Sequence, residues 1–490
     1  MKRLLTAAAA LALLAGAAEA QRTDIVMGVQ LEPPLLDPTA GAAAAIDEIV
    51  YANVFEGLTR IDRDGAVRPA LAREWEISED GLTYTFHLVE GATFHDGTGF
   101  DAEDVVFSLE RATAEGSQNA QQALFEPIER VEAVDPATVR ITLKRPTGDF
   151  LFNLGWGDAV IVAPESAGTN ATEPVGTGPF RFVEWAKGDR VDLARYADYW
   201  GEPAALERAT LKFIADPTAA FAALMAGDVD AFQRWPSPET APQLEADPRF
   251  TVAYGASEGE TILSTNNGRE PFDRLKVRRA IAHALDSEAI VEGAMFGVGK
   301  PIGSHFPPHN PDYVDLTGLH PHDVAQAKAL LAEAGFPDGF EATLKLPPPA
   351  YARRGGEMVA AQLREVGIDL TIENVEWAQW LEQVFRNKDY DLTIVSHTEP
   401  RDINIYARPD YYFQYDNPDF QALIDELDAT ADPDARSALL KRAQRIIAED
   451  AVNGFLFQAG KIGVWNADLR GIWENSPTQA TDLTGVYWTE

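Results

Sequence analysis

Strand-like and helix-like patterns alternate along almost the whole of this chain, with no internal repeat and no low-complexity tract. Alternating β and α signals are typical of an α/β architecture with helices covering a sheet. The run 392–395 is apolar apart from Thr393, as expected of a strand covered on both faces. Other strands are predicted at 82–88, 138–143, 190–196, 210–215, 261–266, 342–346, 369–374 and 455–465.

Helix boundaries are marked by capping residues at several points. Asp216 and Pro217 provide an N-cap and a first-turn proline, and Gly227 ends the same segment. Asp101 is an N-cap candidate followed by acidic residues. Further helices are predicted at 323–335, 357–367, 418–430 and from 432 onward.

The first twenty residues have the features of a secretory signal peptide. Lys2 and Arg3 precede an apolar run from 4 to 18, and Ala18-Glu-Ala20 forms a small-x-small cleavage site. The run is shorter than the roughly 20 apolar residues of a spanning helix. The chain has no cysteine, which excludes a lipidated N-terminal cysteine, disulfides and thiolate chemistry. We therefore predict a periplasmic protein that is not a lipoprotein.

The length of the chain limits the number of domains, and its charge limits the kinds of partner. The mature chain, about 470 residues, predicts two or three domains. Its net charge of −36, with no basic block after the signal, argues against a nucleic-acid partner and is typical of a soluble exported protein.

A series of motifs then covers nearly all of the mature chain. It begins with Phe55-Glu-Gly-Leu58, and its later members are Arg68-Pro-Ala-Leu-Ala-Arg-Glu-Trp75, Asp80-Gly-Leu-Thr-Tyr-Thr-Phe86, Phe94-His-Asp-Gly97, Ala102-Glu-Asp-Val105, Gly176-Thr-Gly-Pro-Phe180, Asp198-Tyr-Trp-Gly201, Ala226-Gly-Asp-Val-Asp230, 271–281 and 327–335. In this order the motifs resemble the extracytoplasmic solute-binding proteins of ABC importers, family 5, which includes dipeptide, oligopeptide and nickel binders.

The resemblance implies a two-lobed, type II-like periplasmic-binding-protein fold with an additional subdomain in lobe I. Lobe I would comprise 21–262, with the subdomain at about 56–176, and 459–490; lobe II would comprise 263–458. Two crossover strands, near 261–266 and 455–464, would form the hinge. The implied function is capture of a small ligand between the lobes and its delivery to a membrane permease, by a monomer without cofactor or covalent chemistry.

The expected ligand is a short peptide, with a nickel chelate, an opine or a sugar derivative as alternatives. Ligands of open α/β sheets lie beyond the carboxyl ends of strands. We therefore expect ligand contacts in the segment that follows 392–395. The resemblance assigns the ligand's amino group to Asp402. Arg401 and Arg408 are candidates for a carboxylate, although an arginine paired with Glu399 is the competing interpretation. Aromatic rings offer stacking surfaces. The predicted ligand-binding set is Asp402, Arg401, Glu399, His397, Trp377, Trp380, Tyr406 and Arg408, and Tyr411 and Tyr412 are further candidates for stacking.

Two other motifs suggest different chemistry. Gly255-Ala-Ser-Glu-Gly259 fits the G-x-S-x-G pattern of serine hydrolases, but no helix pattern follows Ser257, so we expect a turn and keep an exported hydrolase only as a remote alternative. His305, His309, His320 and His322 are imidazoles of the kind that bind nickel, copper or zinc. Prolines interrupt this segment, so we expect a solvated loop and no metal site.

Overall fold

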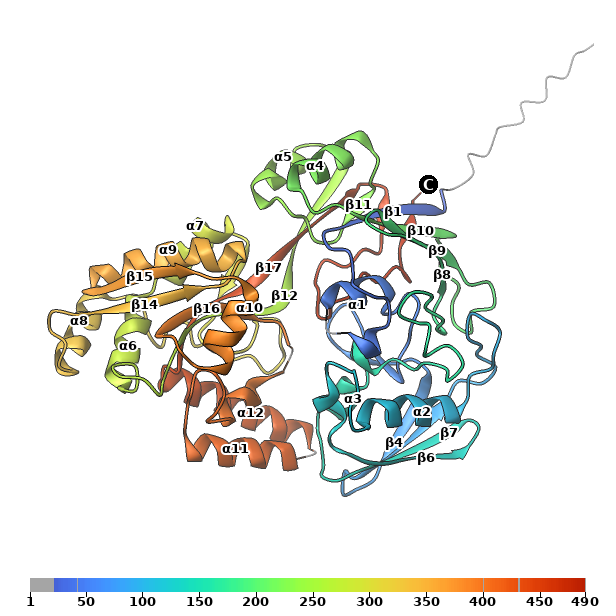
Figure 1. The fold of residues 1–490 in the computed structure, drawn as a ribbon, viewed down its shortest axis with the longest axis horizontal. Helices are drawn as coiled ribbons and strands as arrows, with labels where there is room; N and C mark the ends of the chain where they lie inside the picture. The colour runs from blue at the N-terminus through green and yellow to red at the C-terminus, as the bar shows by residue number, and fades with distance from the viewer. Residues whose placement is uncertain (1–21, 42, 400, 431, 490) are drawn as a thin grey trace, which may run out of the picture.

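The computed structural model describes residues 22–489 except 42, 400 and 431. The predicted signal peptide therefore lies outside the described residues. Two long antiparallel strands, β12 (Phe250–Thr265) and β17 (Asn453–Asn466), run through the centre of the molecule and join two lobes (Figure 1). One sheet continues through both lobes in the order β15-β14-β16-β12-β17-β11-β1-β10-β9-β8. The predicted two-lobed α/β fold is confirmed.

Lobe II is a sheet covered by helices on both faces. Leu392 and Ile394 point into one apolar core, while Val395 points into the other, as the alternation of side chains along a strand requires. Its elements are α6 (Leu275–Ala284), α7 (Ser287–Met295), β13 (Gly299–Pro301), α8 (Val324–Glu333), β14 (Phe340–Leu346), α9 (Ala350–Glu365), β15 (Ile368–Asn374), α10 (Trp377–Trp380), β16 (Leu392–His397), α11 (Pro418–Ala429) and α12 (Pro433–Glu449).

Lobe I holds the other end of the large sheet and returns to it through the C-terminal segment. Trp465, Leu483 and Val486 share one apolar core with β1 and α1. The elements of this lobe are β1 (Asp24–Val29), α1 (Ala44–Val50), β8 (Phe180–Ala186), β9 (Arg190–Arg195), β10 (Arg208–Phe213), α4 (Pro217–Ala226), β11 (Ala231–Phe232), α5 (Ala241–Glu245), β18 (Leu469–Arg470) and β19 (Tyr487–Trp488).

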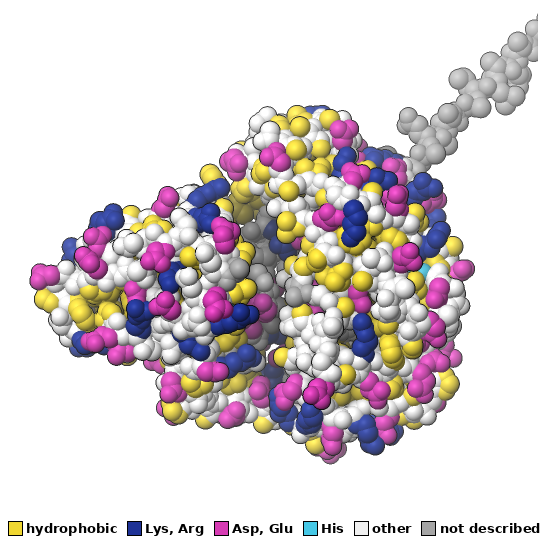
Figure 2. Space-filling model, in the orientation of Figure 1, with side chains coloured by type: hydrophobic (Ala, Val, Ile, Leu, Met, Phe, Trp, Pro, Cys, Tyr) yellow, Lys and Arg dark blue, Asp and Glu magenta, His cyan; other side chains and the backbone are white. Residues whose placement is uncertain are grey.

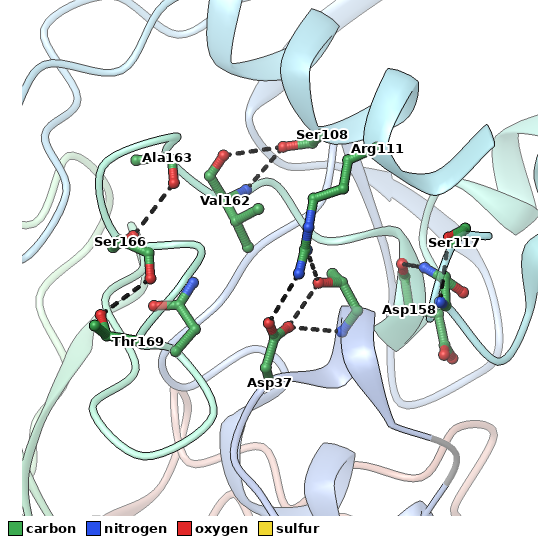
Figure 3. A network of polar contacts seen from close by, with 12 residues as sticks. Asp37, Ser108, Arg111, Ser117, Asp158, Val162, Ala163, Ser166 and Thr169 are labelled. Carbon is green, nitrogen blue, oxygen red and sulfur yellow. Dashed lines mark hydrogen bonds and ion pairs between the residues drawn. The ribbon is translucent and has the colours of Figure 1, made fainter. Parts of the chain in front are cut away.

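A four-stranded antiparallel sheet in the order β4-β5-β7-β6 forms a subdomain with its own core beside lobe I. Polar contacts hold its helix in place (Figure 3): Arg111 contacts the Asp37 carboxylate of lobe I at 3.4 Å, and Ser108 Oγ donates to the Val162 carbonyl at 3.0 Å. The elements are β2 (Thr59–Ile61), β3 (Val67–Pro69), β4 (Ala72–Ile77), β5 (Thr83–Leu88), α2 (Ala102–Thr113), β6 (Ile128–Asp135), β7 (Thr138–Leu143) and α3 (Phe150–Asn153).

The turn predicted at 255–259 is wrong. These residues lie inside β12, whose pairing with β17 is irregular between Ala256 and Glu260. A run of glycines and a serine suggests a turn. Here the same residues form a bulge in β12, at the point where the C-terminal segment passes close to the strand. Among the described helices, none combines the length and the apolar character that a membrane crossing requires.

Candidate ligand-binding site

The carboxyl end of β16 faces the gap between the lobes, and Figure 2 shows the surface hollowed there. His397 is the last residue of β16, and Asp402 precedes a short 3-10 helix, Ile403–Ala407. The next residue upstream of Asp402, Arg401, contacts the subdomain of lobe I. The predicted position after a buried strand therefore lies at the junction of the two lobes.

Asp402 lies between two histidines that come from distant parts of the chain. Its Oδ1 is 2.8 Å from His305 Nε2, and its Oδ2 is 3.5 Å from His397 Nδ1. Burial alone would raise the pKa of Asp402, but the charge and hydrogen bond of His305, together with His397, lower it well below its usual value. Burial lowers the pKa of His397, and the hydrogen bond to Asp402 more than reverses this, so the pKa is raised. Asp402 is consequently an ionised acceptor whose side chain is 15% exposed.

The second nitrogen of each ring is held by a tyrosine. Tyr406 Oη lies 3.1 Å from His305 Nδ1, and Tyr412 Oη lies 3.0 Å from His397 Nε2. Asn453 Nδ2 also donates to Tyr406 Oη at 3.2 Å. Both imidazoles are thus fixed in orientation, with one nitrogen turned toward the carboxylate of Asp402.

Further carboxylates gather around Asp402. Glu260 of β12 is 2% exposed, and its Oε2 has no hydrogen-bond partner among the described residues. Burial, followed by the charges of Asp402, Glu258 and Glu399, raises the pKa of Glu260 well above its usual value. Glu258 pairs with His309 Nε2. Several acidic groups on one wall make it attractive to a cation.

The structure separates the remaining predicted residues into exposed and buried ones. Trp377 is 41% exposed, and Arg408 and Glu399 are also exposed, so all three are accessible. Trp380 and Tyr406 are buried in the core behind the site, where the Trp380 indole donates to Thr393 Oγ1 at 2.9 Å. Their rings support the wall and do not line its surface.

Arg401 holds a carboxylate of the protein itself. Its Nη1 is 2.8 Å from Asp149 Oδ1, and its guanidinium lies over the Phe152 ring, 4.1 Å from the centroid. Arg436 of α12 reaches the other oxygen of Asp149 at 2.9 Å. Asp149 precedes α3, so this cluster joins lobe II to the subdomain of lobe I. A cavity of about 200 Å³ lies beside it, lined in part by Gly148, Phe306 and Asn310.

Sequence reasoning missed His305 and Glu260 as members of this site. The solvated loop predicted for the histidine-rich segment is wrong at His305, which is fully buried. The prolines do prevent a helix, but they do not prevent the loop from packing against Asp402, which His305 contacts. The signal for Glu260 was an acidic residue directly before the predicted crossover strand at 261–266, and periodicity alone gave this residue no role.

Ser257 lacks the surroundings of a hydrolase nucleophile. Its Oγ donates to the Ala459 carbonyl at 2.6 Å and accepts from Gly259 N at 3.2 Å, and β12 continues to Thr265 without the helix that a nucleophile elbow needs. The motif is part of the hinge.

Known proteins resemble the chain over most of its length. Residues 66–420 match bacterial extracellular solute-binding proteins, family 5 Middle. Heme-binding protein A of Haemophilus influenzae is 30% identical over 431 residues, which cover 79% of this chain and 78% of its own. Glutathione-binding protein GsiB of Pectobacterium atrosepticum is 33% identical over 386 residues, covering 77% and 74%.

Solved structures agree with this. The periplasmic binding protein DppA from Helicobacter pylori, in complex with the peptide STSA, superimposes with a TM-score of 0.81 at 26% identity and covers 96% of this chain and 99% of its own. HbpA2 from Haemophilus parasuis gives 0.84 at 26% identity, covering 95% and 100%. The predicted resemblance and the solute-binding role for an ABC importer are confirmed. The chain belongs to the bacterial extracellular solute-binding proteins, family 5.

Proposed function

We propose that the protein captures a short peptide between its lobes and presents it to an ABC permease. The observation that carries the choice of ligand is the ionised carboxylate of Asp402, held by His305 and His397 at the lobe junction and surrounded by further acidic groups. A free ammonium group is the cation that a peptide offers to such a wall. The relatives that are named for binding a peptide and glutathione support this class of ligand.

In this proposal Asp402 accepts the ligand's amino group, with Glu399 adding negative charge. Arg408, exposed on the same segment, takes the carboxylate end, and Trp377 offers an exposed ring for stacking. His397 orients Asp402, while Trp380 and Tyr406 support the wall from behind. Arg401 acts in closure because it already binds Asp149 across the gap.

Charge alone does not provide the affinity. A charge-assisted hydrogen bond contributes roughly 1.5–3 kcal/mol net, so holding both ends of a zwitterion contributes about 3–6 kcal/mol. Micromolar binding needs about 8 kcal/mol. Stacking, backbone pairing and the exclusion of water on closure must supply the remainder, which is why the ligand favours the closed state over the open one.

The experiment is titration with a set of di- to pentapeptides, in EDTA, of the wild type, of Asp402→Asn and of the control Asp410→Asn. Asp410 is exposed on the same loop. We expect micromolar binding by the wild type and the control, and a loss of about tenfold or more in Asp402→Asn. An unchanged affinity in Asp402→Asn would refute the amine contact.

Mass spectrometry of the solute retained by the native protein tests the ligand class. A chelate, an opine or a sugar found there would contradict the proposed peptide ligand.

We also propose that export removes residues 1–20 and that the lobes divide at 262/263 and 458/459, with the subdomain at about 56–176. Both hinge divisions fall within β12 and β17. N-terminal sequencing of the exported protein should begin at Gln21. A different first residue would contradict the cleavage site.

A further inference from the structure

We propose that His305, His397 and Asp402 bind a divalent first-row transition-metal ion beside Glu260. This site goes beyond the capture of a peptide, because it needs no peptide to form. One imidazole nitrogen from each histidine and the carboxylate of Asp402 all lie within 4.8 Å of one another. Within the described residues, this is the group of three or more histidines and carboxylates that meets that spacing. Imidazole and carboxylate are both ligands of zinc, and imidazole also suits nickel.

The separations between donor atoms fit a shared ion. Ligands at about 2.0–2.2 Å from a metal lie roughly 2.9 Å apart at a right angle and roughly 3.4 Å apart at the tetrahedral angle. The two nitrogen–oxygen separations are 2.8 Å, from His305 Nε2 to Asp402 Oδ1, and 3.5 Å, from His397 Nδ1 to Asp402 Oδ2, so each imidazole faces its own oxygen of the carboxylate. An ion requires side-chain rotations that bring these donor atoms, which all lie within 4.8 Å of one another, around one point.

The outer contacts are those of a prepared metal site. A metal-bound histidine needs its other nitrogen fixed by a hydrogen-bonding partner, which sets the tautomer and the direction of the ring. Tyr406 does this for His305 and Tyr412 does it for His397. These four rings also contact one another: His305 lies edge-on to His397 and to Tyr406, and His397 stacks on Tyr412 with an interplanar angle of 10°.

Glu260 supplies an independent reason to expect a cation. It is directly opposite His397 in the antiparallel pairing of β12 with β16, so the two side chains project from the same face of the sheet. Its Oε2 is buried and has no hydrogen-bond partner among the described residues. A buried carboxyl oxygen without a hydrogen-bond partner is unfavourable, and a metal ion that takes the place of the proton would give this oxygen a partner.

Another pair of histidines in lobe II provides a matched control. The rings of His283 and His320 are 5.1 Å apart, similar to the 5.2 Å between His305 and His397. Each of these control rings uses one nitrogen to contact a backbone carbonyl, that of Pro321 or Ala448. Among the residues that the structure describes, the two rings do not form a group with a carboxylate that meets the spacing of a metal site. If paired imidazoles alone bound the metal, this pair would bind it as well.

The test is calorimetric titration of the EDTA-treated, dialysed mature chain with ZnCl₂ and NiCl₂ alone at neutral pH. We expect saturable binding of a single ion. His397→Gln and Asp402→Asn should each weaken it by about tenfold or more, and Tyr412→Phe by about tenfold. His283→Gln should leave it unchanged. Binding no tighter than about 1 mM, or equal loss in His283→Gln, would overturn the site.

X-ray absorption of the zinc-loaded wild type keeps the proposal testable even where a variant fails to fold. Two imidazole ligands and carboxylate oxygen support the site, whereas a shell of oxygen alone overturns it.

The peptide titration separates the two proposals. Peptide binding in EDTA without any metal binding refutes the metal site alone. Metal binding without binding of any peptide refutes the proposed peptide ligand alone.

Discussion

At the scale of single residues, Glu260 shows a conflict between stability and binding. Its raised pKa means that the carboxyl group keeps its proton in the folded protein while the unfolded chain releases it. Stability is therefore lost as pH rises from about 4.5, the ordinary pKa of glutamate, toward the higher folded value. We expect Glu260→Gln to raise the free energy of unfolding of the metal-free protein by about 1–3 kcal/mol at pH 8.

The same substitution should change little at pH 4, where the carboxyl group is mostly protonated in both states. Denaturant unfolding in EDTA at the two pH values measures the difference. A variant that is no more stable at pH 8 than the wild type would show that Glu260 has a partner in solution.

Residues differ in how far the sequence reveals their place. The segment that holds Asp402 was predictable because the strand before it has the apolar run of a buried strand, and strand ends face ligands; the family resemblance selected Asp402 within that segment. His305 and Glu260 were not predictable, because their role depends on which loop folds beneath which strand. Arg401 was predicted to hold a carboxylate, but its partner, Asp149, lies 252 positions away. A local sequence pattern predicts what kind of group a residue can bind more readily than it predicts which residue binds it in the fold.

At the scale of elements, β12 depends on a glycine for a close crossing. A Cβ at Gly255 would come within 1.7 Å of the Glu474 carbonyl oxygen. Neighbouring bonds hold that segment in place: Ala256 N donates to Asn475 Oδ1 at 2.9 Å, and Ser476 N donates to the Ala256 carbonyl at 2.8 Å. We expect Gly255→Ala to lower the free energy of unfolding by about 1–3 kcal/mol, because backbone cannot yield as a side chain can.

Gly485→Ala is the control, since its Cβ would meet nothing within 4 Å. Chemical denaturation of both variants measures the effect. Equal stability of Gly255→Ala and Gly485→Ala would mean that the C-terminal segment does not press on the hinge strand in solution.

Elements with capping chemistry were predicted well, because a cap is a local interaction. Asp101 and Asp104 form the predicted N-terminus of α2, and the Asp216 side chain accepts from Ala219 N at the start of α4. By contrast α9 begins at Ala350, seven residues before the predicted start, because Gly355 and Gly356 concealed its first turns. Gly356 has a packing role, since a Cβ there would lie 2.4 Å from the Leu346 side chain.

At the scale of the whole molecule, Asp149 of the subdomain lies against two arginines of lobe II. Arg401 and Arg436 each take one carboxylate oxygen, at 2.8 Å and 2.9 Å. The pairing also requires a glycine next to Asp149, because a Cβ at Gly148 would lie 2.1 Å from the Arg436 guanidinium. These contacts join the lobes opposite the hinge and disappear if the lobes separate, so they favour the closed state alone.

We therefore expect Asp149→Asn to shift the ligand-free population toward the open state and to weaken ligand capture by about three- to tenfold, the range of a partly exposed ion-pair cluster. Added salt should weaken capture by the wild type more than by the variant, because screening acts on the pair that the variant lacks. Distances between labels on the two lobes, with and without ligand, measure the shift. Asp247→Asn, which breaks the exposed pair with Arg249 inside lobe I, is the control. An open population and a salt dependence equal to those of this control would show that the lobes close without the help of Asp149.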